Sequence, residues 1–171
     1  MLKSATKFVA LTFGVLAVAT TAEAQSTKVL QKFKDWALYS HSGNPADICF
    51  VTGQPRESKP VGYKKERSYF YVSSWPKDGV KAEVSIKVGK PLRDGSEVRI
   101  QIGNSRFTLF TKNDKAFVSD PTQELKLIDS MKRGSYMFVR ATTNDGTAIE
   151  DVYSLSGVTA AVNMLNQGCS S

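Results

Sequence analysis

Hydrophobic and polar residues alternate along much of the chain with a period of two, which is typical of β-strands that bury one face. In the segment 81–89, Ala82, Val84, Ile86 and Val88 alternate with polar or charged residues. Similar short segments recur, separated by turns rich in Gly, Pro, Asn and Asp. The pattern predicts strands at 33–39, 48–52, 68–74, 81–89, 97–102, 106–111, 115–118, 136–142 and 147–155.

Two later segments show the three- and four-residue spacing of helices instead. The first is expected to begin after Asp120 as N-cap, with Pro121 in its first turn, and to end at Gly134. The second covers residues 156–168, with Ser156 as its cap. The predicted apolar stripe of the first helix consists of Leu125, Ile128 and Met131, with Leu127 beside them.

Short strands followed by two helices predict a mainly β protein, an antiparallel β-sandwich with a small β-barrel as the alternative. The polar, basic segment 53–66 is expected to be a mobile loop. Because no internal repeat or linker interrupts the pattern, residues 25–171 are predicted to form a single domain.

The first 24 residues have the organisation of a cleaved signal peptide. Lys3 and Lys7 precede an apolar segment from Phe8 to Ala19, which is too short to span a bilayer, and cleavage is expected near Ala24. No later segment is long and apolar enough to be a transmembrane helix. The sequence therefore predicts export, to the periplasm or to the outer membrane or exterior.

Basic residues outnumber acidic ones, and this affects the choice of partner. Removing Lys3, Lys7 and Glu23 with the signal peptide lowers the formal net charge from +7 to +6. A basic surface favours anionic partners. Since export separates the protein from nucleic acid, the expected partner is an anionic component of the envelope or of a host surface.

The chain contains two cysteines, Cys49 and Cys169. In an oxidising compartment, a disulfide between them is expected rather than two free thiols. A redox role is disfavoured because there is no C-x-x-C motif. Two thiols and one histidine do not make a closed metal site, so neither a metal nor another cofactor is predicted.

Aromatic and basic residues gather around the segment 64–77. Tyr69, Tyr71 and Trp75 are expected to share one strand face, whereas Phe70 and Val72 share the other. Aromatic anchors beside cations are typical of recognition surfaces, although an aromatic core is the alternative. The candidate binding patch consists of Lys64, Lys65, Arg67, Tyr69, Tyr71, Trp75 and Lys77.

No motif indicates an enzyme. His41 is the single histidine and is expected in a polar loop. Ser74 and Lys77 have S-x-x-K spacing, but Pro76 follows a strand and the companion motifs are absent. Glu150 and Asp151 are expected on opposite strand faces, so they do not form a carboxylate pair. The remaining candidates for an unrecognised catalytic site, all in one predicted strand, are Asp151, Tyr153 and Ser154.

Several motifs in order, "FKDWALYS", "YVSSWPKDGVKAEVSIKVGKPL", "IGNSRFTLFTKNDKAFVSD", "LIDSMKRGSYMFVRAT" and "DGTAIEDVYSLSGVTAAV", together with the final cysteine, resemble the invasion-associated locus B family. The resemblance implies an exported protein with an immunoglobulin-like antiparallel β-sandwich and a link to host-cell invasion. It carries over no catalytic residues. Where many members have a cysteine after "DW", this chain has Tyr39 and Ser40, which favours the pairing of Cys49 with Cys169.

These observations favour a non-enzymatic envelope or periplasmic binding protein, used in host-cell invasion or in envelope maintenance. Two alternatives stay open at this point. One is a periplasmic enzyme built around Asp151 and Tyr153. The other is a chaperone-like module that accepts a client strand at an exposed sheet edge.

Overall fold

The computed structural model describes residues 26–41 and 48–167. The predicted signal peptide and Cys169 lie outside the described residues, and so does the segment 42–47. The described strands are β1 (Thr27–Phe33), β2 (Trp36–His41), β3 (Ile48–Gly53), β4 (Glu57–Lys59), β5 (Tyr69–Trp75), β6 (Val80–Lys87), β7 (Glu97–Ile102), β8 (Ser105–Lys112), β9 (Lys115–Phe117), β10 (Tyr136–Thr142) and β11 (Ala148–Ser154).

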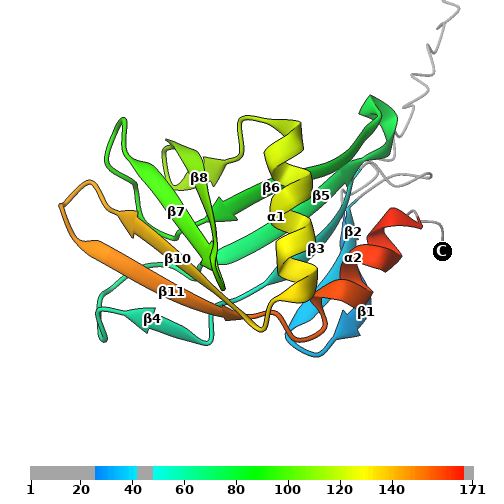
Figure 1. The fold of residues 1–171 in the computed structure, drawn as a ribbon, viewed down its shortest axis with the longest axis horizontal. Helices are drawn as coiled ribbons and strands as arrows, with labels where there is room; N and C mark the ends of the chain where they lie inside the picture. Colours follow the sequence, from blue (N-terminus) through cyan, green and yellow to red (C-terminus); the bar gives the residue numbers. More distant parts are fainter. Residues whose placement is uncertain (1–25, 42–47, 168–171) are drawn as a thin grey trace, which may run out of the picture.

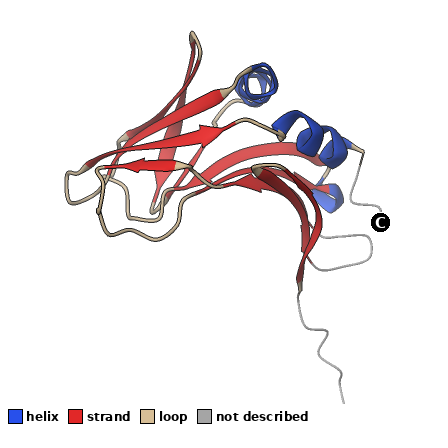
Figure 2. Ribbon diagram, turned by 90° about the horizontal axis from the view of Figure 1, so that it is seen from below, coloured by secondary structure: helices blue, strands red, loops and turns tan. Residues whose placement is uncertain are grey.

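These strands form one antiparallel sheet in the order β1-β2-β3-β5-β6-β9-β8-β7-β10-β11-β4. Within the described residues, β1 pairs with β2 alone and β4 with β11 alone, so the sheet is open and is not a closed barrel. Figure 2 shows how strongly the sheet curves. The prediction of a mainly β, antiparallel fold with two helices is therefore confirmed.

The curved sheet brings strands together that are not neighbours in it. The Phe70 ring of β5 lies 6.0 Å from the Tyr153 ring of β11, measured between ring centroids. Trp36 Nε1 of β2 donates a 2.9 Å hydrogen bond to the Ser154 carbonyl oxygen of β11. Because several strands separate β11 from β2 and β5 in the sheet order, the two halves of the sheet face each other across a shared core.

Alternation decides which residues fill this core. Phe70 and Val72 of β5 are fully buried, whereas Tyr69 and Tyr71 lie half-buried on the outer face. The same rule applies to β7, β10 and β11. The largest fully buried side chains are Trp36, Tyr153, Phe70, Leu38, Ile86, Ile100, Leu109, Leu127, Met131 and Met137.

Helices α1 (Pro121–Arg133) and α2 (Val158–Asn166) pack against the sheet, α1 on β6 and β8 and α2 on β1, β2 and β3 (Figure 1). Asp120 is the N-cap of α1, as predicted, and its carboxylate accepts a 2.8 Å hydrogen bond from the Thr122 N–H. Gly134 is the C-cap of the helix, as predicted, and a Cβ there would lie 2.5 Å from Ile102 Cγ2.

The structure corrects two expectations about the helices. Leu125 does not belong to the apolar stripe of α1, since it is 64% exposed, whereas Leu127, Ile128 and Met131 are buried. The N-cap of α2 is Gly157, not Ser156. Gly157 has a φ of +95°, and a Cβ would lie 1.9 Å from the Phe33 oxygen, so only glycine fits there.

Three further differences concern strands. β1 was not predicted, because its residues are almost all exposed and do not alternate in burial. His41 ends β2 instead of lying in a loop, and its Nδ1 is 2.7 Å from Thr27 Oγ1. The segment 53–66 contains β4, which pairs with β11 and so ties this segment to the sheet.

Candidate functional site

Lys65 and Asp151 form a buried ion pair, although the two residues come from different candidate sites. Lys65 Nζ lies 3.0 and 2.9 Å from the two carboxylate oxygens of Asp151. The side chains are only 8% and 2% exposed. Asp151 follows Ile149 on the core-facing side of β11, while Glu150 points outward, as alternation predicted.

The polar groups around this pair satisfy both charges. Ser58 Oγ donates a 2.6 Å hydrogen bond to Asp151. Lys65 also contacts the Ser68 hydroxyl and the Val88 carbonyl oxygen, and Ser68 donates to the same carbonyl. The cluster therefore fixes the segment 58–68 onto β11.

The other two residues of the proposed catalytic site are also buried. The Tyr153 hydroxyl has no hydrogen-bond partner in the described part of the chain. Burial raises the pKa of the Tyr153 phenol well above its usual range, and the charge of Asp151 adds to this rise. The hydroxyl of Ser154 accepts a 3.2 Å hydrogen bond from the Ser156 N–H. The three side chains line the core and not an open site.

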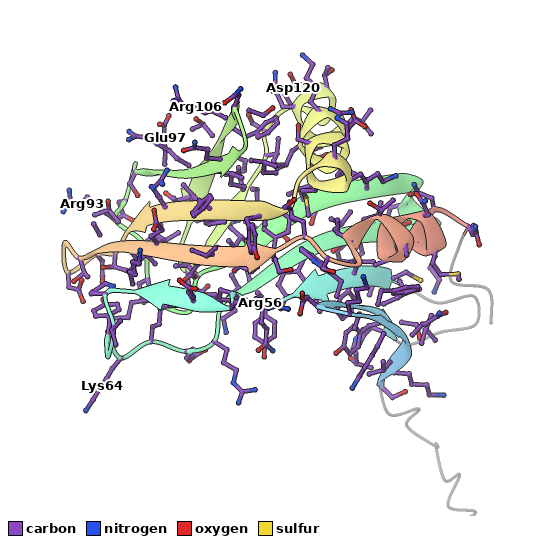
Figure 3. All side chains as sticks on the ribbon, turned by 60° about the horizontal axis from the view of Figure 1, so that its bottom comes forward. Arg56, Lys64, Arg93, Glu97, Arg106 and Asp120 are labelled. Atoms are coloured by element: carbon purple, nitrogen blue, oxygen red, sulfur yellow. The ribbon has the colours of Figure 1, made fainter. Side chains whose placement is uncertain are left out.

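The residues of the predicted binding patch do not lie together on one surface. Lys65 points inward to Asp151, whereas Lys64 and Arg67 are exposed, and Figure 3 shows Lys64 projecting away from the ribbon. Trp75 lies at the far end of β5 from Tyr69. Because each residue advances a strand by about 3.3 Å, the two residues are about 20 Å apart. Its indole Nε1 is buried and has no hydrogen-bond partner among the described residues. Lys77 is exposed in the short 3₁₀ helix that follows.

Tyr69 and Tyr71 belong instead to a row of aromatic rings on the outer face of the sheet. Tyr39 stacks on Phe50 with ring centroids 5.2 Å apart and an interplanar angle of 4°. Phe50 contacts Tyr71 at 5.8 Å, and Tyr71 contacts Tyr69 at 6.0 Å. We call these four rings, from strands β2, β3 and β5, the aromatic row.

The other half of the sheet carries a basic outer surface, which we call the arginine face: Arg99, Gln101, Arg106 and Arg140. Arg99 of β7 lies directly opposite Arg140 of β10, and Gln101 lies opposite Arg106 of β8. Arg140 donates to Glu150 at 2.7 Å and to Gln101 at 3.0 Å. Within the part of the chain that the structure describes, neither Arg99 nor Arg106 forms an ion pair.

Two hollows meet at the arginine face, with volumes of about 580 and 340 Å³. Arg99 and Arg140 line both of them. Their charged lining consists of four basic residues and two acidic ones: Lys59, Arg99, Arg106, Arg140, Glu97 and Glu150. Arg106 and Glu97 project from the same side of the molecule in Figure 3. The surface is thus positive on balance and open to solvent.

The comparisons with known proteins agree with the motifs read from the sequence. A model of the invasion associated locus B (IalB) protein family matches residues 36–166, which is most of the chain. This chain belongs to the IalB protein family. The family resemblance drawn from the sequence motifs is therefore confirmed, and the IalB match begins at Trp36, the first residue of β2.

The IalB fold is also found among solved structures. The crystal structure of invasion associated protein B from Bartonella henselae is similar to this chain, with a TM-score of 0.56 and 16% sequence identity. The similarity covers 79% of this chain and 94% of the Bartonella chain. At this identity the likeness establishes the fold. No curated protein matches the sequence.

Metal-binding groups, membrane-spanning helices and the cysteines of this IalB family protein remain to be described. Within residues 26–41 and 48–167, no group of three or more His, Cys, Asp or Glu residues is placed to hold a metal ion. No helix in the described chain is long and apolar enough to cross a membrane. Cys49 is buried in β3, and since Cys169 is not described, the bridge between them stays a prediction.

Proposed function

We propose that this IalB family protein is an exported, non-enzymatic binding protein that holds an anionic component of the bacterial envelope or of a host surface. The arginine face is the proposed contact surface. Family membership supports the link to invasion, and the basic composition supports an anionic partner. The residues suggested for an enzyme, Asp151, Tyr153 and Ser154, are buried, which argues against catalysis there.

The pairing of Arg99 with Arg140 is the observation that carries this proposal. Like charges directly opposite each other in an antiparallel pair are destabilising. Glu150 and Gln101 compensate Arg140, but Arg99 and Arg106 have no ion-pair partner in the described structure. A bound anion neutralises this repulsion between the two guanidinium groups. The repulsion that is removed therefore adds to the affinity for the anion.

The side-chain chemistry indicates which anions fit. Guanidinium groups are planar and bind carboxylate, phosphate or sulfate through two parallel hydrogen bonds. Several arginines along one open surface suit a ligand with repeated charges better than a single small ion. Lipid head groups and acidic polysaccharides both have this property.

The experiment compares two double variants of equal charge. Arg99→Gln/Arg106→Gln removes two arginines from the arginine face, and Arg67→Gln/Arg133→Gln removes two exposed arginines elsewhere. Binding is measured by salt elution from immobilised heparin and by sedimentation with vesicles containing phosphatidylglycerol. The proposal expects the first variant to elute at clearly lower salt than the second. Equal shifts for both variants show that only net charge matters and overturn the proposal.

One observation also favours the chaperone-like alternative. β1 is an edge strand, and its Val29 and Leu30 are exposed. An open edge with apolar side chains can accept a further strand. However, β1 has a register shift between Val29 and Gln31, which disturbs the regular edge that an added strand needs. Suppression of the aggregation of an unfolded outer-membrane protein tests this alternative directly.

A further inference from the structure

A third hollow, about 330 Å³ in volume, lies on the outer face of β2, β3 and β5, away from the arginine face. Ala37 of β2 and Thr52 of β3 are register partners and form its floor. Both are small, so the outer face is depressed between larger neighbours. The volume falls within the range of about 300–1,000 Å³ that is typical of small-molecule sites.

Tyrosines stand at the two ends of this floor. Tyr39 lies two residues beyond Ala37 along β2. On the other side of the floor, Thr52 pairs with Tyr71 of β5. Tyr69 lies two residues before Tyr71, at the end of the floor away from Tyr39. Tyr39 and Tyr69 are the two ends of the aromatic row, and both line the hollow. Phe50 and Tyr71 lie between the two end rings in the row, and each packs against one of them.

Lysines lie along the rim of this hollow. Lys32 of β1 is the register partner of Ala37, and Lys34 follows in the turn between β1 and β2. Both side chains are exposed, and neither forms an ion pair with another described residue. The one carboxylate in the lining, Asp35, is bound by Arg56 Nη2 at 2.8 Å to each oxygen. The rim is therefore positive.

The backbone at Lys34 is a separate observation. Lys34 has a φ of +55°, a left-handed conformation that glycine or asparagine adopts at lower cost. The other non-glycine residue with positive φ in the described chain is Asn113, which suits that conformation. A lysine in this turn therefore carries a backbone cost that glycine would not.

We infer that this hollow binds an acidic oligosaccharide, with one sugar ring packed on Tyr39 and another on Tyr69. A sugar ring has apolar C–H faces that pack on aromatic rings and a polar rim of hydroxyl groups. Thr52 and Gln54 in the lining offer hydrogen-bonding groups to those hydroxyls. Lys32 and Lys34 are placed to bind the carboxylate of the sugar. An apolar peptide side chain would leave these polar groups and both cations unpaired.

The probe for the test is tetragalacturonic acid, with its neutral methyl ester and polyglutamate as comparison ligands. Binding is measured by calorimetry and by the NMR shifts of the Tyr39 and Tyr69 rings. Tetragalacturonic acid is expected to bind saturably and to shift both tyrosines. The neutral ester should bind more weakly, and polyglutamate should leave the tyrosine signals unchanged.

The variants separate the lysine side chain from its backbone. Lys34→Gly removes the cation and the backbone strain, whereas Asn113→Gly makes the same backbone change on another hairpin. Lys34→Gly should raise the Kd about fivefold or more, and Asn113→Gly should leave it unchanged. Ala37→Leu fills the floor and should also weaken binding without loss of stability.

Three results with the ligands and the single variants overturn the inference. These are the absence of saturable binding, equal tyrosine shifts with polyglutamate, and equal effects of Lys34→Gly and Asn113→Gly. The variant Arg99→Gln/Arg106→Gln keeps this hollow intact, so tetragalacturonic acid should still shift the Tyr39 and Tyr69 rings in it. A loss of these tyrosine shifts in that variant places the saccharide on the arginine face alone and also overturns the inference.

Discussion

Lys65 and Asp151 are 86 residues apart in the sequence and meet in the core with Nζ and Oδ2 2.9 Å apart. The lysine comes from the connection between β4 and β5, and the aspartate comes from the inner face of β11. Their contact fixes a surface segment onto a strand of the opposite half of the sheet. A buried ion pair of this kind is costly to break from one side, because the remaining charge is left without a partner.

Lys65→Met is expected to lower the free energy of unfolding by about 3–5 kcal/mol, since it leaves the buried Asp151 carboxylate uncompensated. Lys64→Met, one residue away and exposed, should change it by less than about 0.5 kcal/mol. Urea unfolding followed by Trp fluorescence measures both. The double variant Lys65→Met/Asp151→Leu should lose less stability than the two single variants added together. Additive losses would show that the two side chains do not interact.

Gly157→Ala tests the turn that precedes α2. The added Cβ would lie 1.9 Å from the Phe33 oxygen, in a residue with a φ of +95°. The loss of stability should exceed about 3 kcal/mol. Gly62 also has a positive φ, +79°, but no atom lies within 4 Å of the place that an added Cβ would take, so Gly62→Ala should cost only about 1–2 kcal/mol. Similar losses of stability for both variants would show that the positive φ alone, and not the contact with Phe33, causes the loss at Gly157.

The acid stability of the protein should depend on Asp145. Hydrogen bonds from the Thr143 and Tyr63 hydroxyls and from the Thr147 N–H lower the pKa of the Asp145 carboxyl well below its ordinary value of 3.8. A lowered folded-state pKa stabilises the fold above the unfolded pKa, and this contribution is lost as the pH falls through the folded value.

Urea midpoints between about pH 6 and pH 3 measure this effect. The wild type should lose stability in the acidic part of this range, and Asp145→Asn should lose less, because it has no carboxyl to protonate there. Asp94→Asn, at another exposed turn, serves as the control and should follow the wild-type curve. Parallel curves for wild type and Asp145→Asn would contradict the prediction.

The predicted bridge between Cys49 and Cys169 can be measured on the exported protein. The intact mass under non-reducing conditions should be lower by two hydrogens than after reduction. Closing so long a loop stabilises by about 4–5 kcal/mol in the chain-entropy model, so reduction should lower the unfolding midpoint. Cys49→Ala/Cys169→Ala should match the reduced wild type. Alkylation of two thiols in the native protein would contradict the bridge.

Local rules predicted much of the fold. Alternation placed Phe70 and Val72 in the core and Tyr69 and Tyr71 outside, and capping chemistry placed the start of α1 at Asp120. β1 was missed because an edge strand that is exposed on both faces has no burial pattern to read. β4 was missed because three polar residues form a strand only through pairing with β11.

The candidate sites were harder to predict because they depend on distant contacts. Lys65 is one of several basic residues in its segment, and nothing local distinguishes it from Lys64. Its partner, Asp151, is set by the register between β4 and β11. The arginine face and the hollow beside Tyr39 likewise join residues from strands that are separated in the sequence. Alternation predicts the face of a residue but not its neighbours.

The pairing of β4 with β11 also has a consequence for the order of folding. β4 leaves the first half of the sheet to pair with a strand that is synthesised more than 80 residues later, and Trp36 is likewise bound to Ser154. Neither the attachment of the segment 58–68 to β11 nor the hydrogen bond between Trp36 and Ser154 can form before β11 emerges. Such a long-range topology folds late and slowly. It suits a chain that has to stay unfolded until almost all of it has crossed a membrane, as the proposed export requires.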